Sequence, residues 1–398
     1  MKAPKGWKIR TLAEVAAIQT GLSKSASRTG DFVRLPYLRV ANVQDGHFDL
    51  SEIKEIDVPK EAVERFRVIT GDLLLTEGGD FDKLGRGALW NGAIPNCVHQ
   101  NHIFVVRANE HVLERRFLAM QTQSAYGRAY FQSCSKQSTN LASINSSQLK
   151  QFPVLLPPLP EQQKIADILG TWDEALEKLD ALIAAKARRK QALMQQLLTG
   201  HRRLPGFSKP WLRAKLGDLF ENRTESNRLD LTLLSITADR GVIPRDTLVK
   251  RDTSSEDKSK YLRIIPGDIG YNTMRMWQGV SALSSLEGIV SPAYTICVPT
   301  NRIDGKFAAH FFKLPHTISL FHRHSQGLVD DTLNLKFPHF ATIEVSVPAD
   351  TSEQRAIAAV LDTADAELRL LRQQRTALDQ QKRGLMQQLL TGKKRVST

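Results

Sequence analysis

The sequence predicts an α+β fold in which two similar globular domains are separated by two long helices, packed as an antiparallel coiled coil with pseudo-two-fold symmetry. The first observation behind this prediction is a repeat: residues 161–200 recur at 353–392 with 19 of 40 positions identical. The second is that the regions before the two copies share strand and turn motifs. The third is that both copies carry an unbroken helical pattern of apolar residues.

Both repeat copies are predicted to form helices, because their apolar residues recur at alternating three- and four-residue steps. The helices should start near Pro160 and at Thr351-Ser352, and stop at Gly200 and Gly392, which gives roughly 57 Å of helix each. The expected pairing stripe comprises Ile165, Leu169, Trp172, Leu176, Leu179, Ile357, Leu361, Leu368 and Leu371.

Charge along the two helices favours antiparallel packing. Each is acidic in its first half and basic in its second, so that only the antiparallel arrangement places acid opposite base at both ends. The alternative interpretation is a helix pair that only joins two domains.

The predicted organisation alternates domain and helix. The segments are a first domain at 1–155, a first spacer helix at 156–203, a second domain at 204–350, and a second spacer helix with the tail at 351–398. Helices are expected at 11–18, 113–131 and 212–220, with short strands between turn signals. RVITGDLLLT at 67–76 matches RIIPGDIGYN at 263–272. Two similar domains held apart by rigid helices predict recognition of a bipartite DNA target, and their sequence divergence predicts unlike half-sites.

Composition indicates a polyanionic partner. The formal net charge is +13 and the isoelectric point is about 9.7. No apolar run reaches the ~20 residues of a membrane span and no signal segment is recognisable, so a cytoplasmic location is expected. Three cysteines without CxxC spacing, Cys97, Cys134 and Cys297, argue against disulfides and zinc.

The candidate reading segment of the first domain is Thr76–Trp90. Its glycines, Gly79 among them, allow close backbone approach, while Lys83 and Arg86 offer charge to phosphate or guanine. The alternative is a glycine-rich hairpin with surface charge. Polar clusters at Gln100-Asn101 and at 138–140 are further candidates for DNA contact, or for capping of local backbone.

The corresponding segment of the second domain is Tyr271–Ser281. It carries Asn272, Arg275 and Gln278, which are residue types that pair with base edges. The alternative places Met274, Met276 and Trp277 in an ordinary core.

Catalytic and metal-binding patterns are missing from the sequence. It contains neither GxxxxGK[ST] nor GxGxxG, and His99, His102, His322 and His324 have no Cys or carboxylate at a supporting spacing. No metal site and no cofactor bound by this chain are therefore expected.

PPLPEQQKIADIL with its long helix to LMQQLLTG, followed by a second domain and a second EQ…LMQQLLTG helix, closely resembles the specificity subunit of type I restriction-modification systems. EGGDFDKLGRG and MRMWQG are similar to segments of that family's target recognition domains. The resemblance implies a non-catalytic subunit whose two recognition domains read a bipartite DNA sequence while the helices set the spacing. It also implies two methyltransferase subunits, which use S-adenosylmethionine on adenine N6, and two ATP- and Mg-dependent motor-nuclease subunits.

Two other classes of protein stay open from sequence: a self-sufficient DNA-modifying enzyme, and a structural coiled-coil scaffold that makes no DNA contact.

Overall fold

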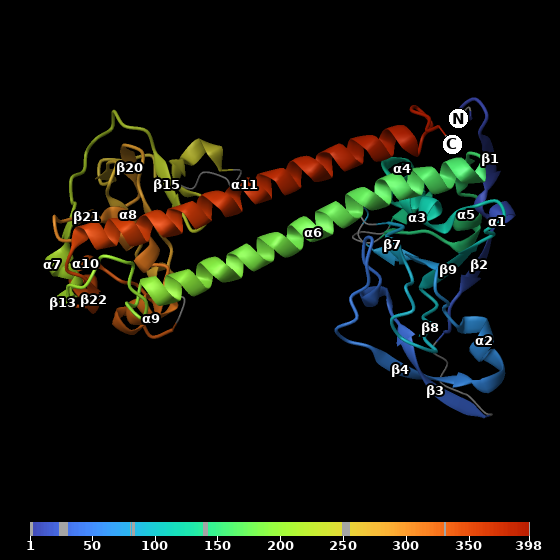
Figure 1. Ribbon diagram of the computed structural model, residues 1–398, viewed down its shortest axis with the longest axis horizontal. Helices are drawn as coiled ribbons and strands as arrows, with labels where there is room; N and C mark the ends of the chain where they lie inside the picture. The colour runs from blue at the N-terminus through green and yellow to red at the C-terminus, as the bar shows by residue number, and fades with distance from the viewer. Residues whose placement is uncertain are drawn as a thin grey trace. The chain divides into compact units, whose positions relative to one another are not determined.

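The computed structural model describes residues 3–23, 31–79, 81, 84–137, 142–248, 255–329 and 332–397. The chain divides into a first unit, Met1–Asp180 with Gln374–Thr398, and a second unit, Ala181–Gln373. Two helices dominate it, α6 (Leu159–Leu197) and α11 (Thr351–Leu389), each of 39 residues (Figure 1). Among the described residues, no helix combines the length and apolar composition that a membrane span requires.

The first unit is built on a four-stranded antiparallel sheet in the order β2-β9-β5-β7. Strands β1 and β12 form a separate pair, β3 lies between β4 and β8, and β11 lies between β10 and β6. The strands are β1 (Lys8–Thr11), β2 (Ala16–Thr20), β3 (Phe32–Leu38), β4 (Lys54–Pro59), β5 (Leu73–Thr76), β6 (Gly78–Gly79), β7 (Gly87–Leu89), β8 (Val98–His99), β9 (Ile103–Ala108), β10 (Lys136–Gln137), β11 (Ala142–Ser143) and β12 (Pro153–Leu156). The shorter helices are α1 (Leu12–Val15), α2 (Val63–Phe66), α3 (Arg115–Gln123), α4 (Ala125–Cys134) and α5 (Ser146–Lys150), with 3-10 turns η1 (Val40–Asn42) and η2 (Lys60–Ala62).

The second unit repeats the central arrangement, with a four-stranded sheet in the order β14-β21-β18-β19 and a separate pair of β13 with β22. Its other pairs are β15 with β16 and β17 with β20. The strands are β13 (Trp211–Lys215), β14 (Phe220–Asn222), β15 (Leu234–Thr237), β16 (Gly241–Pro244), β17 (Leu262–Ile264), β18 (Ile269–Asn272), β19 (Ser281–Leu283), β20 (Gly288–Val290), β21 (Tyr294–Pro299) and β22 (Glu344–Pro348). The helices are α7 (Leu216–Leu219), α8 (Gly305–Phe311), α9 (Pro315–His324) and α10 (Phe337–Ala341), with 3-10 turns η4 (Arg245–Thr247) and η5 (Met276–Gln278).

Each unit closes its hydrophobic core with the start of one long helix and the end of the other. In the first unit, Ile165 and Leu169 of α6 join Leu389 of α11 in a core with the sheet and α3. In the second, Leu197 of α6 joins Leu361 of α11 in the corresponding core. The repeated helices are therefore part of both cores, and their apolar stripes are buried there by the domains.

Ion pairs inside each unit run in opposite order along the two helices. In the first unit Asp173 pairs with Lys382, and the later Asp180 pairs with the earlier Arg375 at 3.1 Å. In the second unit Lys190 of α6 pairs with Asp365 of α11 at 2.5 Å, and the earlier Lys186 pairs with the later Glu367. Within each unit, the paired helix segments therefore run in opposite directions.

Three expected helices differ from the structure. The periodic residues at 11–18 and 212–220 form only the single turns α1 and α7, each set between two strands. Those strands pair with β12, β9, β22 and β21, so sheet pairing overrides the local helical pattern. The helix expected at 113–131 is divided into α3 and α4 at Ser124, whose hydroxyl accepts from Gly127 N at 3.3 Å and caps α4.

Candidate nucleic-acid interface

In each unit a buried aspartate fixes the turn that leads into the central strand. Asp72 accepts from Ile69 N at 2.9 Å, and both its carboxylate oxygens accept from Arg107 at 2.8 Å. Asp268 likewise accepts from Ile265 N at 3.0 Å, but its guanidinium partner is Arg223, which follows β14. Because each arginine donates to a carboxylate, its pKa is raised and its charge is secured.

The segment after this strand is also held in the same way in both units. Ile144 N donates to Glu77 O at 2.9 Å in the first unit, and Leu335 N donates to Thr273 O at 2.8 Å in the second. Both bonds tie the chain that leaves the central strand to the loop before the final strand of the domain. The two turns are therefore equivalent in position, and we call them the first and second reading turns.

The second reading turn, Thr273–Val280, is a compact 3-10 turn anchored from below. Met276 is fully buried in the core, Asn272 Oδ1 accepts from Met274 N at 3.0 Å, and Trp277 Nε1 donates to Met274 O at 3.0 Å. Arg275 and Gln278 are exposed. The core interpretation thus holds for Met276 but not for the half-exposed Met274, while Trp277 packs edge-on to His322 with ring centroids 5.8 Å apart.

Lys313 supports the end of this turn from α9's side. Its Nζ donates to Gly279 O at 2.6 Å, and Gly279 has a φ of +76°. A Cβ at Gly279 would lie 2.8 Å from the Ile318 side chain, so the position requires glycine. Burial, together with the nearby charge of Lys190, lowers the pKa of Lys313 to about 8.

The first reading turn, Glu77–Gly87, is built differently. Its strand β6 pairs with β11, and a Cβ at Gly85 would lie 2.3 Å from the Phe131 ring, which explains one of the glycines. A Cβ added at Gly79 would meet no described atom within 4 Å, so this backbone position leaves room for a ligand to approach. Arg86 is half-buried and its Nη2 donates to Val40 O at 3.4 Å, so its guanidinium lies against the domain.

The polar residues Gln100 and Asn101 lie beside the first reading turn. Glu77 N donates to His102 O at 3.0 Å, and Glu77 Oε2 lies 2.6 Å from His102 Nδ1. Both Gln100 and Asn101 are half-buried. Lys83 and residues 138–140 lie outside the described residues.

The residues of the predicted pairing stripe are distributed over both units. Ile165, Leu169, Ile357 and Leu361 are fully buried within the two cores, and Leu176, Leu179 and Leu368 are buried along the helices. Trp172 and Leu371 are half-buried.

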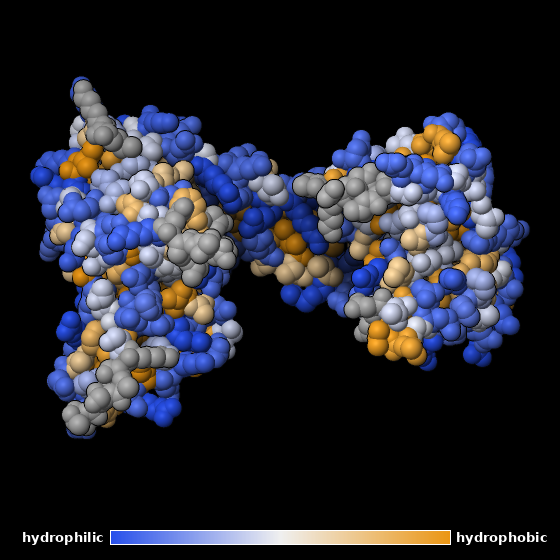
Figure 2. Space-filling view, turned by 180° about the vertical axis from the view of Figure 1, so that it is seen from behind, coloured by the Kyte–Doolittle hydropathy of each residue, from blue (hydrophilic) through white to orange (hydrophobic). Residues whose placement is uncertain are grey.

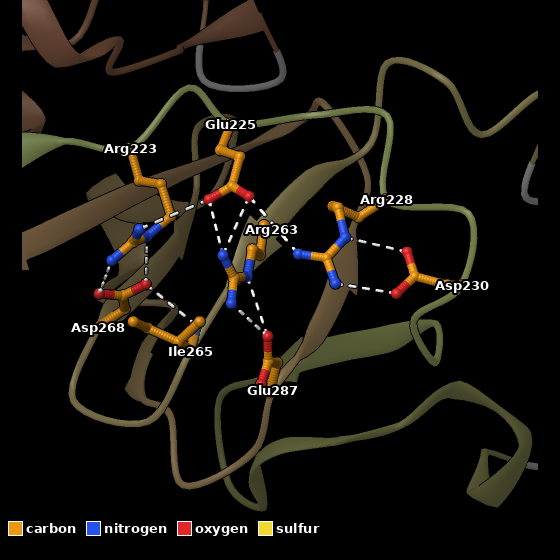
Figure 3. Close-up of polar contacts among 8 residues, drawn as sticks. All are labelled: Arg223, Glu225, Arg228, Asp230, Arg263, Ile265, Asp268 and Glu287. Carbon is orange, nitrogen blue, oxygen red and sulfur yellow. Dashed lines mark hydrogen bonds and ion pairs between the residues drawn. The ribbon is translucent and has the colours of Figure 1, made fainter.

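The second unit also contains an ionic network away from its reading turn (Figure 3). Arg263 binds Glu225 at 3.0 Å and Glu287 at 2.5 Å, while Nε and Nη2 of Arg228 donate to the carboxylate of Asp230. With the Arg223–Asp268 pair, three guanidinium groups face four carboxylates. Their charges are satisfied mutually, so this surface leaves no net cation to attract phosphate.

A cavity of about 890 Å³ in the first unit lies among α3, α4 and the adjoining parts of α6 and α11. Its basic side chains are already paired: Arg116 with Asp167 at 2.9 Å, Arg128 with Asp45, Lys382 with Asp173, and Arg383 with Asp379 at 3.0 Å. The cavity is therefore polar but electrostatically balanced.

The described residues contain no group of three or more His, Cys, Asp or Glu side chains arranged to hold a metal ion. His99 is buried, its Nδ1 lies 3.1 Å from Phe66 O, and burial lowers its pKa to about 4. His99 is thus a neutral core residue at ordinary pH.

Sequence reasoning missed the contacts that hold the long helices to the domains. Gln162 Oε1 accepts from Glu114 N, and its Nε2 donates to Val112 O and Pro157 O. Gln354 makes the same three contacts with Asp304 N, Arg302 O and Pro348 O. The signal was present, since an identical Glu-Gln pair opens both repeats.

A second missed pair follows the end of each helix. Arg203 binds Glu353 through two nitrogens, at 2.5 and 2.7 Å, and stacks on Trp211. Arg395 binds Glu161 at 2.6 Å through two nitrogens and stacks on Trp7. Both arginines stand three residues after the terminal glycine of their helix.

Comparison with known proteins gives the class first. Residues 4–186 match the family described as the type I restriction modification DNA specificity domain. These residues include the first reading turn and the start of α6.

One relative matches almost the whole chain, and another matches less than half of it. A MjaX type I restriction enzyme specificity subunit from Methanocaldococcus jannaschii is 23% identical over 418 residues, covering 99% of this chain and 95% of the relative. The EcoKI specificity subunit of Escherichia coli is 27% identical over 166 residues, covering 40% of this chain and 35% of that protein.

Solved structures share the fold. A chain from a structure titled for complex assembly and conformational transition of the type I R-M system superposes with a TM-score of 0.63 at 18% identity, covering 98% of this chain and 99% of that one. The type I S subunit from M. genitalium gives 0.55 at 14% identity, with 98% of both chains covered. Together, the comparisons indicate a type I restriction-modification DNA specificity domain at residues 4–186 and similarity of the whole chain to type I specificity subunits.

Proposed function

We propose that each globular domain reads one half of a bipartite, asymmetric DNA target, through the reading turn that follows its central strand. The observation that carries this proposal is the equivalence of the two turns. Each turn is fixed by a buried aspartate of its own unit and by one backbone hydrogen bond to the loop before the final strand of that unit. The two turns nevertheless differ in residues and shape. A common support with unlike exposed side chains fits two half-sites of different sequence.

The domains of this proposal are 1–155 and 204–350, and α6 and α11 form an antiparallel coiled coil between them with pseudo-two-fold symmetry. In the proposal the helices set the half-site spacing and dock two methyltransferase subunits, and two motor-nuclease subunits join for restriction. S-adenosylmethionine, ATP and Mg act on those partners, in the cytoplasm, and the specificity subunit itself catalyses no step. Repeated cross-helix contacts, Lys190 with Asp365 and Lys382 with Asp173, support the helix pairing.

The test is Arg275→Ala in a complex reconstituted with the cognate methyltransferase, followed by sequencing of the methylated DNA. Loss of a base contact should cost about 1–3 kcal/mol of discrimination at one position of the second half-site and leave the first half-site unchanged. Arg213→Ala, an exposed arginine on β13, is the matched control. An unchanged motif at normal efficiency would remove Arg275 from the interface.

The spacing role has a separate test. Inserting seven residues into both helices at matched positions keeps the apolar stripe and adds about 10 Å of helix. The gap between half-sites should lengthen by about three base pairs, at ~3.4 Å each. A motif with the original gap contradicts the spacing role.

The two other classes make opposite predictions. A self-sufficient enzyme would transfer labelled methyl groups from S-adenosylmethionine without added subunits. A structural scaffold would leave a cognate methyltransferase indifferent to DNA sequence. The proposed function predicts that the chain alone transfers no methyl group. It also predicts that the complex with the methyltransferase modifies DNA in a sequence-specific way.

A further inference from the structure

Helices α3 and α8 occupy the same place in the two units. Each begins at an acidic cap, since Glu114 accepts from Phe117 N at 2.7 Å and Asp304 accepts from Phe307 N at 2.9 Å. Both phenylalanines are buried in the core of their own unit. Counting from the cap therefore identifies equivalent residues of the two helices.

The start of each of these helices is attached to a long helix (Figure 1). The backbone N–H of the cap donates to a buried glutamine, from Glu114 to Gln162 of α6 at 2.8 Å and from Asp304 to Gln354 of α11 at 2.7 Å. Two residues after the cap, a cation pairs with an aspartate of the same long helix. These pairs are Arg116 with Asp167 at 2.9 Å, and Lys306 with Asp362 at 3.0 Å.

The other end of each helix supplies a side-chain donor to the reading turn of its unit. Both donors stand nine residues after the cap. Gln123 Nε2 donates to Gly87 O at 2.8 Å, and Lys313 Nζ donates to Gly279 O at 2.6 Å. Gly87 ends the first reading turn, and Gly279 stands one residue before the end of the second. Two chemically different donors thus occupy equivalent positions and reach the same part of the turn.

The second partners of the two carbonyls are unequal. Gly46 N donates to Gly87 O at 2.9 Å, whereas Ser281 Oγ is 3.5 Å from Gly279 O. A 3.5 Å contact is a weak hydrogen bond, and a charged donor makes a stronger bond than a neutral one. The second reading turn therefore depends on its helix donor more than the first does.

An apolar docking surface is the other role that helices at these positions could have. Phe117 and Phe307 are fully buried, so α3 and α8 direct these apolar side chains into their own cores. On the face drawn in Figure 2, hydrophobic patches are separated by hydrophilic surface. The contacts that the two helices share are therefore those with the long helix and with the reading turn.

We propose that Gln123 and Lys313 are positioning residues, which hold the two reading turns in the conformation that recognises a half-site. The inference rests on the proposed function and adds to it how each turn is fixed to a long helix of its unit. Recognition requires the contacting side chains to be held within about 0.5 Å of their bound geometry. A turn tied through α3 or α8 to a 39-residue helix is ordered before DNA binds, which lowers the entropy cost of binding.

The charge of Lys313 makes the two units differ in their response to pH. Burial, together with the nearby charge of Lys190 on α6, lowers the pKa of Lys313 to about 8. Lys190 is itself paired with Asp365 of α11, and His310 of α8 lies 3.9 Å from the same carboxylate. A neutral amine donates a weaker hydrogen bond than an ammonium group, so the hold on Gly279 should weaken as pH rises through about 8. The amide of Gln123 does not titrate.

The test measures discrimination in the whole complex with its methyltransferase. Discrimination is the ratio of kcat/KM for methylation of the cognate duplex to that of a duplex with one substitution in a stated half-site. Lys313→Met should lower discrimination at the second half-site about tenfold and leave the first unchanged. Gln123→Leu should lower it about fivefold at the first half-site and leave the second unchanged.

The matched controls replace the same residue types at positions that do not contact a reading turn. Lys215→Met changes an exposed lysine of β13, and Gln132→Leu changes a half-buried glutamine of α4. Both controls should keep wild-type discrimination at both half-sites. Thermal unfolding of each variant shows whether it folds.

The wild type supplies a measurement that needs no variant. Between pH 7 and pH 9, discrimination at the second half-site should fall about threefold or more relative to the first, because the Lys313 bond loses its charge. The second unit becomes more stable over the same range, because the lowered pKa of Lys313 means that the unfolded chain binds more protons. A purely structural contact would make discrimination follow stability, so the two roles predict opposite directions.

Wild-type discrimination in folded Lys313→Met and Gln123→Leu would overturn the proposal. So would an equal loss at both half-sites from either variant, since the side chain would then act on the whole fold. If Lys313→Met does not fold, the wild-type pH profile decides, and a profile that is the same for both half-sites overturns the role of Lys313. Absence of sequence-specific methylation by the wild type would instead contradict the proposed function, so the two failures are distinguishable.

Discussion

In the first unit the turn after β5 is paired into a small sheet with β10 and β11, whereas in the second unit the turn after β18 is a short 3-10 turn supported by Lys313. Beneath both turns, the aspartate, the glycine with a φ of +97° and the backbone bond to the following loop are the same. The shared parts lie under the surface and the unlike parts lie on it. This difference indicates that the two units share the buried contacts that hold the turn and differ in the residues that the turn exposes.

The glutamines that hold the long helices to the domains are equivalent in the two units. Gln162 and Gln354 make three equivalent hydrogen bonds each, and both are fully buried. The buried aspartates differ more, because Arg107 comes from the strand β9 and Arg223 from the segment after β14. Mutation of the two glutamines should therefore have the same effect in both units. Mutation of the two arginines should have different effects, because they come from different elements.

Removing either glutamine should have the largest effect. Gln354→Ala and Gln162→Ala each leave one amide and two carbonyls without partners, at a cost of roughly 3 kcal/mol or more. Hydrogen exchange of peptides from the affected unit should show the loss as faster local opening. Gln373→Ala, an exposed position on α11, is the control. A loss confined to one of the two glutamines would break the equivalence of the units.

The arginine partners of the buried aspartates should have unequal effects. Arg223 is 19% exposed and Arg107 is 45% exposed, although both bind their aspartate through two nitrogens. Arg223→Met should therefore cost about 3 kcal/mol, because it leaves a buried carboxylate unpaired, and Arg107→Met about half as much, because water reaches the pair. Denaturant unfolding followed by unit-specific hydrogen exchange measures both. Equal losses would mean that exposure of the arginine does not govern the pair.

Acid should destabilise the first unit through His99. The equivalent position in the second unit is Val290, because Arg67 pairs with Val98 as Arg263 pairs with Ile289. The pKa of His99 is about 4 in the folded chain, below the ordinary 6.5, because burial disfavours the charged ring. The unfolded chain therefore binds more protons between these values, and stability falls as pH drops from about 6.5 to about 4. At pH 5 the loss from this residue is about 2 kcal/mol relative to pH 7.

His99→Val, which copies the second unit, should remove that part of the acid sensitivity. The measurement is the free energy of unfolding of the first unit between pH 7 and pH 5, with the second unit of the same chain as the internal reference. A variant that keeps the wild-type pH dependence would show that His99 is not the titrating group.

The long helices were predictable because their pattern is local and repeated. Residues 161–200 and 353–392 specify helix by apolar period alone, and the structure gives 39 residues for each. The pattern at 11–18 was misleading because Leu12 and Val15 face the core within a single turn, while the following residues pair with β9. Pairing with a strand about ninety residues away is not visible in an eight-residue window.

The candidate site was predictable only as far as its position. A shared Gly-Asp turn marked both reading turns, and Arg275 and Gln278 are exposed there. The sequence did not reveal that Arg86 hydrogen-bonds toward Val40, or that Lys313 reaches Gly279 from 34 residues away. Those contacts depend on tertiary placement, which residue type and spacing do not specify.

The smallest effects concern two equivalent ion pairs on the long helices, Lys382 with Asp173 and Lys190 with Asp365. Each alone is worth at most about 1 kcal/mol, because the carboxylates are largely exposed. Lys190 also lies near the half-buried Lys313 and helps to lower its pKa to about 8. At pH 7 Lys190→Ala loses an ion pair but also relieves the repulsion felt by Lys313, and it should cost less than Lys382→Ala.

The difference between these two variants should shrink as pH rises through 8. Lys313 then becomes neutral in the folded chain while it stays protonated when unfolded up to about pH 10.5, so the repulsion disappears and second-unit stability rises over that window. Double-mutant cycles at pH 7 and pH 9, with Asp365→Asn and Asp173→Asn as partners, isolate each pair. If Lys190→Ala and Lys382→Ala cost the same at both pH values, the charge of Lys190 does not affect Lys313. The two ion pairs would then contribute equally to stability.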